Sequence, residues 1–391
     1  MDMKVFKRSR LIHLLFAISY FTSGLIINTM QCILYYTVHK INKTLYRKLN
    51  YYLCCSLYSQ LVFMGDWWSN SKIILYIDKN DFDQYWGKEH ACCIMNHTYE
   101  IDWLIGWMTC DRINMLGNCK AYAKKVIQYL PVLGWCWKFS EFVFLERSYE
   151  KDRANIHKQV GELADHPDPM WLLLFPEGTR FSQSKHKASE QFATERNYKQ
   201  LKYHLQPRTR GFVTSLPPMH GKVPAVYDII VAFDENDSVK PTITSMLHGK
   251  AVTAHMYMKR IPLEEVPESE ADQDNFIREL FQKKDQMKES FVKTGDFFET
   301  SGVERVEGFS LPRRLHPLIN MVMWMITILC PMIYYLIRLL FSGQMIYFCI
   351  GAGILLIFYC LLNRSIGMSK ISKQSSYGGT AQNATTIKKD N

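Results

Sequence analysis

Three long apolar segments constrain the fold of this chain more than any other feature. Leu11–Val38 contains no Asp, Glu, Lys or Arg, and His13 is its only residue that titrates near neutral pH. The other two segments, Ile319–Ile337 and Met345–Leu362, lie near the C-terminal end. Leu11–Val38 is long enough to cross about 30 Å of hydrocarbon, and the other two have the length expected of a transmembrane hairpin. A shorter apolar run, Tyr51–Met64, is followed by paired tryptophans, which suit a membrane interface. The sequence therefore predicts a polar block held between membrane segments.

These segments divide the chain into four predicted parts. An N-terminal membrane-associated two-helix unit covers 1–68, and a cytosol-facing block covers 69–316. A transmembrane hairpin covers 317–363, and a polar tail, expected to be disordered, covers 364–391. The middle block has roughly 250 residues, which is enough to bury one core of its own.

The positive charge of the chain is concentrated beside the apolar segments. The formal net charge is +10, but lysine and arginine form no continuous tract of the kind that binds nucleic acid. Both outer flanks of the C-terminal hairpin are basic, which predicts that they lie on the cytosolic side. The last four residues, Lys388-Lys389-Asp390-Asn391, resemble the di-lysine retrieval signal of endoplasmic-reticulum membrane proteins. We therefore expect a multi-pass protein of that membrane, with the middle block in the cytosol, no nucleic-acid partner, and protein partners left open.

The middle block alternates strand-like and helix-like runs. The expected strands are Lys72–Ile77, Ala91–Met95, Phe142–Leu145, Trp171–Phe175, Tyr227–Phe233 and Thr253–Lys259. The expected helices are Ile101–Cys110, Ala121–Tyr129, Lys151–Ala164 and Asp272–Lys293. This alternation predicts an α/β domain with a mostly parallel sheet flanked by helices. Active sites of such sheets gather in the loops that follow the strands.

A histidine and an aspartate follow the expected strand Ala91–Met95. His97 and Asp102 would lie about 140° apart on one continuous helix, so they can meet only if His97 is in the loop and Asp102 in the first helical turn. Asn96 and Thr98 are capping residue types that allow such a helix start. Asp102 could then fix the imidazole tautomer and leave the other ring nitrogen basic. With twelve histidines in the chain, one such spacing is also expected by chance.

Arginines follow several of the expected strands. Trp171–Phe175 leads into Phe175-Pro176-Glu177-Gly178-Thr179-Arg180, and Phe142–Leu145 leads into Glu146-Arg147. The planar guanidinium group suits phosphate. Several arginines at successive strand ends, on the side of His97, suggest a substrate that bears phosphate. Each arginine taken singly could equally pair with a surface acid.

Along the chain come Asn96-His97-x4-Asp102, then Phe142–Arg147, then Phe175–Arg180. In this order they resemble the first three motifs of the glycerolipid acyltransferase superfamily. Within it, the chain is similar to the 1-acylglycerol-3-phosphate acyltransferases of the animal gamma/delta type. Further similarities to that group are Tyr122-Ala123-Lys124-Lys125, Pro131-x2-Gly134-Trp135, Tyr203-His204-x2-Pro207-Arg208-Thr209 and Ala225-Val226-Tyr227-Asp228. Two stretches, Leu216-Pro217-Pro218 and Val223-Pro224-Ala225, compete for the fourth motif of the superfamily, so no role is assigned to either.

The resemblance implies roles for particular residues. It implies His97 as the general base and Asp102 as its orienting partner. The residues that it implies for binding lysophosphatidate are Arg147, Glu177, Gly178, Thr179 and Arg180, with Lys124 as a further phosphate ligand. The implied reaction moves an acyl group from acyl-CoA, as a substrate, to the sn-2 hydroxyl of lysophosphatidic acid at the bilayer. No cofactor is implied, and the dispersed histidines show no metal-ligand spacing.

Two other functions remain open at this point. One is a related acyltransferase that acts on lysophosphatidylinositol, lysophosphatidylcholine or glycerol 3-phosphate. The other is a membrane protein that keeps the lipid site but does no chemistry. The presence of all residues of the three motifs argues against a non-catalytic protein, which should have lost some of them.

Overall fold

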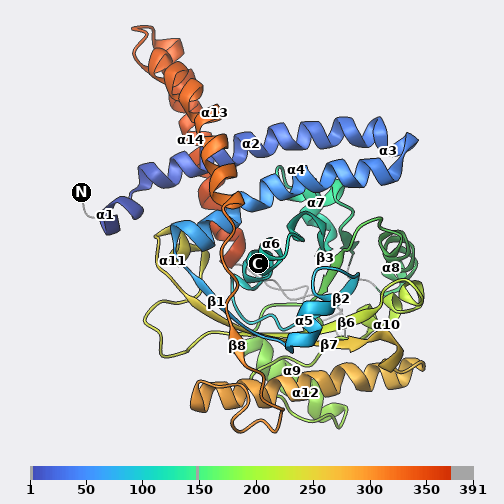
Figure 1. Cartoon of the computed structure of the whole chain (residues 1–391). Helices are drawn as coiled ribbons and strands as arrows, with labels where there is room; N and C mark the ends of the chain where they lie inside the picture. Colours follow the sequence, from blue (N-terminus) through green and yellow to red (C-terminus); the bar gives the residue numbers. More distant parts are fainter. Residues whose placement is uncertain (1–2, 147–148, 371–391) are drawn as a thin grey trace, which may run out of the picture.

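The computed structural model describes residues 3–146 and 149–370, and its centre is one eight-stranded sheet (Figure 1). The strands are β1 (Lys72–Tyr76), β2 (Ala91–Met95), β3 (Cys119–Lys124), β4 (Val143–Leu145), β5 (Trp171–Leu174), β6 (Ala225–Ala232), β7 (Thr253–Pro262) and β8 (Gly308–Phe309). Their order is β4-β3-β5-β2-β6-β7-β1-β8. The five strands from β4 to β6 are parallel to their neighbours, whereas β7 pairs antiparallel with β6 and β8 antiparallel with β1. The predicted α/β class with a mostly parallel sheet is confirmed.

Helices cover both faces of this sheet. The longer ones are α2 (Arg10–Tyr36), α4 (Lys43–Phe63), α6 (Asp102–Arg112), α8 (Tyr149–Ala164), α9 (Gln183–Glu195), α12 (Glu270–Thr294), α13 (His316–Leu340) and α14 (Met345–Lys370). The shorter ones are α1 (Met3–Lys7), α3 (Val38–Ile41), α5 (Lys79–Tyr85), α7 (Leu133–Phe139), α10 (Arg210–Ser215) and α11 (Ile243–Leu247). A π-helical turn spans Met64–Trp68, and 3₁₀ turns span Leu116–Asn118, Lys125–Tyr129, Pro217–Met219 and Leu263–Glu265.

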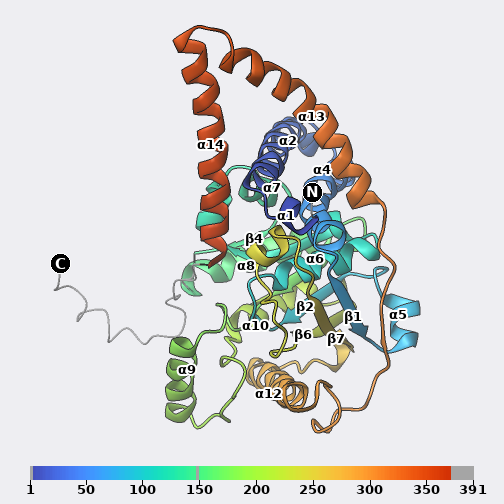
Figure 2. The same ribbon diagram turned by 90° about the vertical axis from the view of Figure 1, so that its left-hand side faces the viewer.

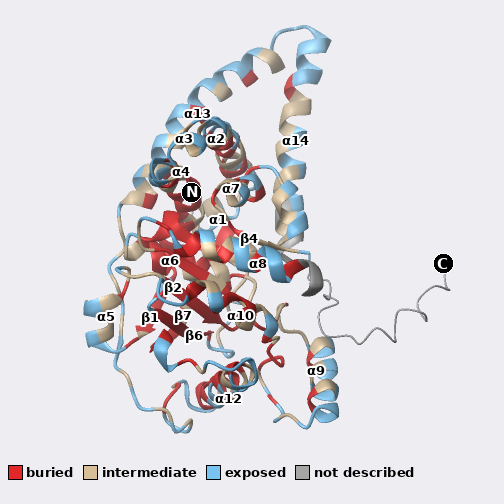
Figure 3. Ribbon diagram, turned by 90° about the vertical axis from the view of Figure 1, so that its right-hand side faces the viewer, coloured by how far each residue is buried: buried red, intermediate tan, exposed pale blue. Residues whose placement is uncertain are grey.

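The central strand β2 shows how the layers are built. Its side chains alternate between faces, as in any strand. Cys93 and Met95 enter a core shared with α4 and α6, whereas Cys92 and Ile94 enter a core shared with α8, α10 and α12. All five residues of β2 are buried, which explains their uninterrupted apolar run. Figure 3 shows the same pattern, with buried residues gathered in the sheet and the helices against it.

One expected helix is in fact a strand. Ala121–Tyr129 is rich in helix-forming Ala, Lys and Gln, but Cys119–Lys124 forms β3 and the next five residues a 3₁₀ turn. β3 hydrogen-bonds to β5 on one side and β4 on the other. Pairing on both edges outweighs a local helix preference of a few tenths of a kcal/mol per residue.

The second N-terminal helix is longer than its apolar run. α4 begins at Lys43, whereas the apolar run begins at Tyr51. Asn42 caps it, because its side-chain oxygen accepts a hydrogen bond from the amide of Leu45 at 2.9 Å. α4 lies beside α2 across the top of the sheet domain (Figure 1), and its Leu57 is fully buried in the same core as the sheet. Residues before 69 therefore help to form the core of the block that follows them.

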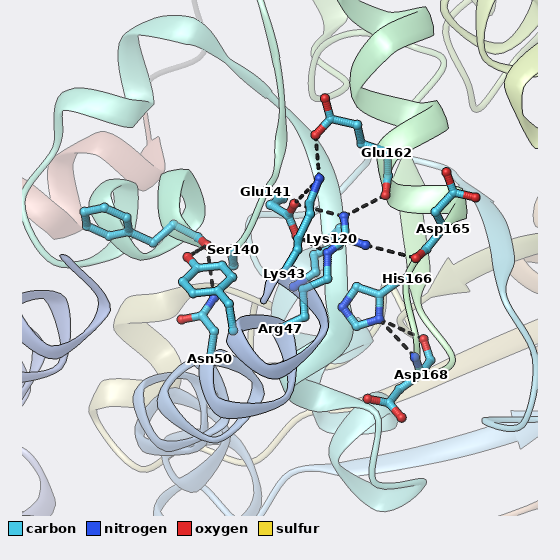
Figure 4. Close-up of polar contacts among 12 residues, drawn as sticks. Lys43, Arg47, Asn50, Lys120, Ser140, Glu141, Glu162, Asp165, His166 and Asp168 are labelled. Carbon is cyan, nitrogen blue, oxygen red and sulfur yellow. Dashed lines mark hydrogen bonds and ion pairs between the residues drawn. The ribbon is translucent and has the colours of Figure 1, made fainter. Parts of the chain in front are cut away.

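Arg47 fastens α4 to the sheet domain (Figure 4). Its Nε and Nη2 donate to the two carboxylate oxygens of Glu141 at 2.8 and 2.9 Å. Its guanidinium also donates to the backbone carbonyls of Glu162 and Asp165, at 2.6 and 3.0 Å. The Arg47 side chain is 4% exposed. One buried cation thus connects α4 with the loop before β4 and the C-terminal end of α8.

Three helices within the described ranges are long and apolar enough to cross a membrane. They comprise α13, α14 and a stretch of 32 residues that starts with α2. α13 and α14 contain the two apolar segments predicted near the C-terminal end, and residues 341–344 join them. Figure 2 shows that this hairpin leaves the sheet domain and returns toward it. α14 continues to Lys370, and the last 21 residues, with the predicted di-lysine signal, lie outside the described ranges.

Candidate active site

His97 and Asp102 meet at the carboxyl end of β2. His97 lies in the loop after the strand, and Asp102 is the first residue of α6. The imidazole Nδ1 lies 3.2 Å from Oδ2 of Asp102. The His97 side chain is 23% exposed and stacks on Phe175, with 4.3 Å between ring centroids. If Nδ1 carries the proton that Asp102 accepts, Nε2 keeps a lone pair that can accept a proton from a bound hydroxyl.

Asp102 also holds the loop that carries His97. Its Oδ2 accepts hydrogen bonds from the amides of Thr98 and Tyr99, both at 2.8 Å. The side chain is 0% exposed. Burial raises the pKa of the Asp102 carboxyl, while the hydrogen bonds from His97 and the two amides oppose this rise. The carboxylate therefore fixes both the ring and the backbone beneath it.

The start of α6 differs from the expected capping. The N-cap position is Ile101, which provides no side-chain cap, so the expected capping roles of Asn96 and Thr98 are wrong. Asn96 instead bonds with β6: its Oδ1 accepts from the amide of Val231 at 2.8 Å, and its Nδ2 donates to the carbonyl of Val231 at 3.1 Å. The amide side chain thus imitates one more residue of the β2–β6 ladder and fixes the backbone just before His97.

Glu177 links this loop to a second one. Its Oε1 accepts from the amide of His97 at 2.6 Å, and its Oε2 accepts from the amide of Leu205 at 3.0 Å. The residue is 1% exposed. Since β5 lies beside β2 in the sheet, the loop after β5 is the natural partner of the His97 loop. Both carboxylate oxygens of Glu177 accept hydrogen bonds from backbone amides. Glu177 therefore supports the two loops from beneath the site.

The pKa of Glu177 predicts a pH dependence of stability. Burial raises this pKa to about 8, although the amides of His97 and Leu205 oppose the rise. A carboxyl whose folded-state pKa exceeds its ordinary value near 4.5 stabilises the fold most at low pH. This contribution declines as the pH rises above that value and is lost above about pH 8. We expect the unfolding temperature in detergent to fall between pH 6 and 9 more steeply for the wild type than for Glu177→Gln. Equal slopes would contradict the prediction.

The turn after Glu177 requires a glycine. Gly178 has a φ of +66°, a conformation that costs other residues about 1 kcal/mol or more. A Cβ at this position would also lie 3.1 Å from Cδ of Arg208. Two backbone hydrogen bonds hold this turn. The amide of Gly178 donates to the carbonyl of Phe175 at 2.9 Å, and the amide of Arg208 donates to the carbonyl of Pro176 at 2.7 Å.

The residues after this glycine lie beside His97. The amide of Phe181 donates to the carbonyl of His97 at 2.8 Å. Thr179 is buried, and its hydroxyl accepts from Nζ of Lys185 at 2.8 Å. Lys185 also donates to the carbonyl of Arg180 at 3.0 Å. The Arg180 guanidinium is half-buried and has no hydrogen bond or ion pair with a residue of the described ranges, so it can take an external anion.

The other predicted phosphate ligands belong to the same edge of the sheet. Lys124 ends β3 and pairs in register with Leu145, the last residue of β4. Since β4, β3, β5 and β2 are consecutive and parallel, their carboxyl ends all meet at the edge of His97. Glu146 forms an ion pair with Lys125 at 2.5 Å. Arg147, predicted from the same motif, lies outside the described residues.

Sequence reasoning missed a group of buried polar residues beneath the site. His204, Asp228, Lys284, Asp285 and Lys288 are drawn together from β6, α12 and the loop before α10. One signal was available: Lys284 falls on the apolar face of α12, three and four residues from Phe281 and Leu280. A lysine at a core position of a helix calls for a buried acid elsewhere in the chain, and here the acid is Asp228.

Comparison with known proteins gives consistent results over nearly the whole chain. The family profile Acyltransferase matches residues 75–215, and the profile Acyltransferase C-terminus matches residues 245–324. The chain is 38% identical over 377 residues to 1-acyl-sn-glycerol-3-phosphate acyltransferase delta of Mus musculus, covering 95% of this chain and 96% of that protein. It is 38% identical over 373 residues to the gamma protein of Homo sapiens, with the same coverage.

A comparison of folds gives a low score for a crystal structure that it matches. This is the 1-acyl-sn-glycerophosphate acyltransferase PlsC of Thermotoga maritima, with a TM-score of 0.39 and 12% identity. The match covers 68% of this chain and 95% of that one.

Proposed function

Since the chain belongs to the family of 1-acyl-sn-glycerol-3-phosphate acyltransferases, we propose that it transfers a fatty acyl group from acyl-CoA to the sn-2 hydroxyl of lysophosphatidic acid. The product is phosphatidic acid, which stays in the membrane. The observation that carries this proposal is the His97–Asp102 pair, held at the same edge of the sheet as the Arg180 loop. A base and a phosphate-binding group side by side suit an acceptor that bears both a hydroxyl and a phosphate.

The proposed mechanism is a direct attack on the thioester. Nε2 of His97 takes the proton of the sn-2 hydroxyl as the oxygen bonds to the acyl carbonyl carbon. The carbon–sulfur bond then breaks, and the departing thiolate of CoA takes the proton from the imidazolium. Asp102 orients the ring and stabilises its positive charge in between. The substrate supplies the nucleophile, so no serine or cysteine is required.

For Arg180 we propose a contact with the phosphate of the acceptor. An arginine–phosphate pair is charge-assisted and often bidentate. Removing such a bond costs about 1.5–3 kcal/mol, or roughly a 10- to 100-fold change. Arg180→Gln should therefore raise KM for lysophosphatidic acid by about that factor, with KM for acyl-CoA little changed. Initial rates at varied concentrations of each substrate would check this. An equal rise in both KM values would contradict a phosphate contact.

We also propose that the enzyme resides in the endoplasmic-reticulum membrane with its sheet domain in the cytosol. Basic residues at both outer flanks of the α13–α14 hairpin support this orientation. The chain carries glycosylation sequons at Asn96 and Asn236, both in the sheet domain. Neither should carry a glycan, and a shift in mass after deglycosylation that maps to either residue would refute the orientation.

An acceptor panel tests the proposed function. Membranes that contain the protein would be given oleoyl-CoA with lysophosphatidic acid, lysophosphatidylinositol, lysophosphatidylcholine or glycerol 3-phosphate. We expect the highest kcat/KM with lysophosphatidic acid. A clear preference for another acceptor would replace the proposed substrate but keep the reaction. Silence with all four would favour the non-catalytic lipid-binding function.

A further inference from the structure

Two neighbouring turns of α12 direct polar side chains toward the active site. Lys284 and Lys288 lie one helical turn apart, and Asp285 lies between them on the same side. The two lysine side chains are only 1% and 5% exposed. α12 runs below the sheet in Figure 1, on the face opposite α4 and α6. Charged groups this far from water need partners. Lys284 pairs with Asp228 of β6, and Lys288 pairs with Glu235 and with the hydroxyl of Tyr99. Asp285 binds the loop that contains His204.

Asp285 connects to His97 through a loop and Glu177. Its carboxylate accepts from the amides of Lys202 and Tyr203, at 2.8 and 2.7 Å. These bonds fix the loop in which Leu205 lies two residues after Tyr203. The amide of Leu205 donates to Glu177. Glu177 in turn accepts from the amide of His97. Each link is a hydrogen bond of 3.0 Å or less.

Lys284 and Lys288 reach the same loop by other routes. Lys284 binds Asp228 and donates to the carbonyl of Ile229 at 2.8 Å. It therefore holds β6 next to β2, just below the Asn96–Val231 bonds. Lys288 donates to the hydroxyl of Tyr99 at 3.0 Å, and the amide of Tyr99 donates to Asp102. α12 thus contacts three different supports of the His97 loop. These are β6 beside the end of β2, the loop that binds Glu177, and the Tyr99 residue that binds Asp102.

A second histidine–aspartate pair belongs to this arrangement. Nδ1 of His204 lies 3.0 Å from Oδ1 of Asp285, which resembles the His97–Asp102 pair. The His204 side chain is 0% exposed, and burial lowers its pKa. The pKa of Asp285 lies below its usual range, since hydrogen bonds from His204 and the two amides outweigh its burial. Because the His204 ring is sealed from substrate, it cannot take a proton from it, so this pair braces the loop.

We infer that α12 is a positioning element of the active site, in which Asp285 and Lys288 set the His97 loop for catalysis from the opposite side of the sheet. This assigns a task to the Acyltransferase C-terminus region, which contains α12. The inference rests on the proposed function, because the loop is held for His97 to act as a base. Neither residue touches substrate, so their loss should affect turnover more than binding.

The test compares two buried changes with one exposed change on the same helix. Lys288→Met and Asp285→Asn each remove one support and keep the side-chain volume, whereas Lys283→Met alters an exposed lysine. Purified full-length protein would be assayed for kcat and for both KM values, well below its unfolding temperature. Hydrogen exchange of the peptide that covers residues 96–101 would be followed in the same samples. The amides of His97, Thr98 and Tyr99 in that peptide report on Glu177 and Asp102 directly.

We expect both buried variants to lose about 10- to 100-fold in kcat, since small misplacements of reacting groups cost that much. KM should change less than threefold, on the order of the loss from a weak contact. Exchange should rise in residues 96–101 and stay unchanged in β7, with Lys283→Met behaving as the wild type. Unchanged kcat and unchanged local exchange would overturn the inference. So would a loss that follows the unfolded fraction, with exchange rising throughout the chain. If the wild type transfers no acyl group, the proposed function fails, and the exchange data alone decide whether α12 holds the loop.

Discussion

His97→Ala is expected to lower kcat by about 10²–10⁴-fold, the usual contribution of a general base. The alanine variant should still fold and insert into membranes, because the loop is held through the backbone of residue 97. Its amide donates to Glu177, and its carbonyl accepts from Phe181. Alanine keeps both bonds. The loss should therefore reflect the missing imidazole and not a displaced loop.

The measurement is acyl transfer from oleoyl-CoA to lysophosphatidic acid in membranes with matched amounts of each protein. His220→Ala is a suitable control, since His220 is exposed and lies after the 3₁₀ turn that follows α10. It should match the wild type. Near-normal turnover by His97→Ala would rule out the mechanism, even if lysophosphatidic acid proved to be the substrate.

Arg47→Met is expected to destabilise the protein by about 3–5 kcal/mol, as is usual when one partner of a buried ion pair is removed. Burial alone would raise the pKa of Glu141, but Arg47 holds it below its usual range. Without the guanidinium, this largely buried carboxylate loses its bidentate partner. The carbonyls of Glu162 and Asp165 lose their donor as well. The measurement is the fraction of protein that stays monodisperse in detergent after heating, determined by gel filtration.

Lys43→Met provides the comparison. Lys43 contacts Glu141 and Glu162 at 3.5 and 2.8 Å, but its side chain is 36% exposed. Exposed pairs contribute about 0–1 kcal/mol. Its loss should hardly change the thermal stability. If Arg47→Met were no less stable than Lys43→Met, α4 would be attached to the sheet domain by its apolar side chains alone.

The sequence predicted the parts of the fold that depend on local pattern. The strand before His97 was predicted with its exact bounds because all five residues are apolar and polar residues follow. The hairpin was predicted because its apolar runs are long and free of charged residues. β3 was misassigned because its helix-forming residues become a strand only by pairing with β4 and β5. The antiparallel β6–β7 pair was not anticipated either, since no local signal gives strand direction.

In the active site too, local features could be predicted and distant contacts could not. The meeting of His97 and Asp102 could be predicted, because both belong to one short loop and the first turn of a helix. The support from Asp285 could not, since more than 180 residues separate it from His97. The role of Glu177 beneath the loop was also out of reach: its motif indicates a carboxylate but not the two amides that it binds. Distant polar contacts depend on tertiary packing, which a single sequence does not reveal.

The length of the α13–α14 hairpin bears on which membranes the protein can occupy. At about 1.5 Å per residue, its two apolar stretches, 319–337 and 345–362, measure roughly 27–29 Å. The hydrocarbon layer of the endoplasmic reticulum is about 27 Å thick, against about 32–33 Å in the plasma membrane. In the thicker layer, the hairpin would have to draw its basic flanks inward or thin the lipid around it. Hydrophobic matching would therefore favour a thinner membrane over a thicker one, by a fraction of a kcal/mol for each Å of mismatch.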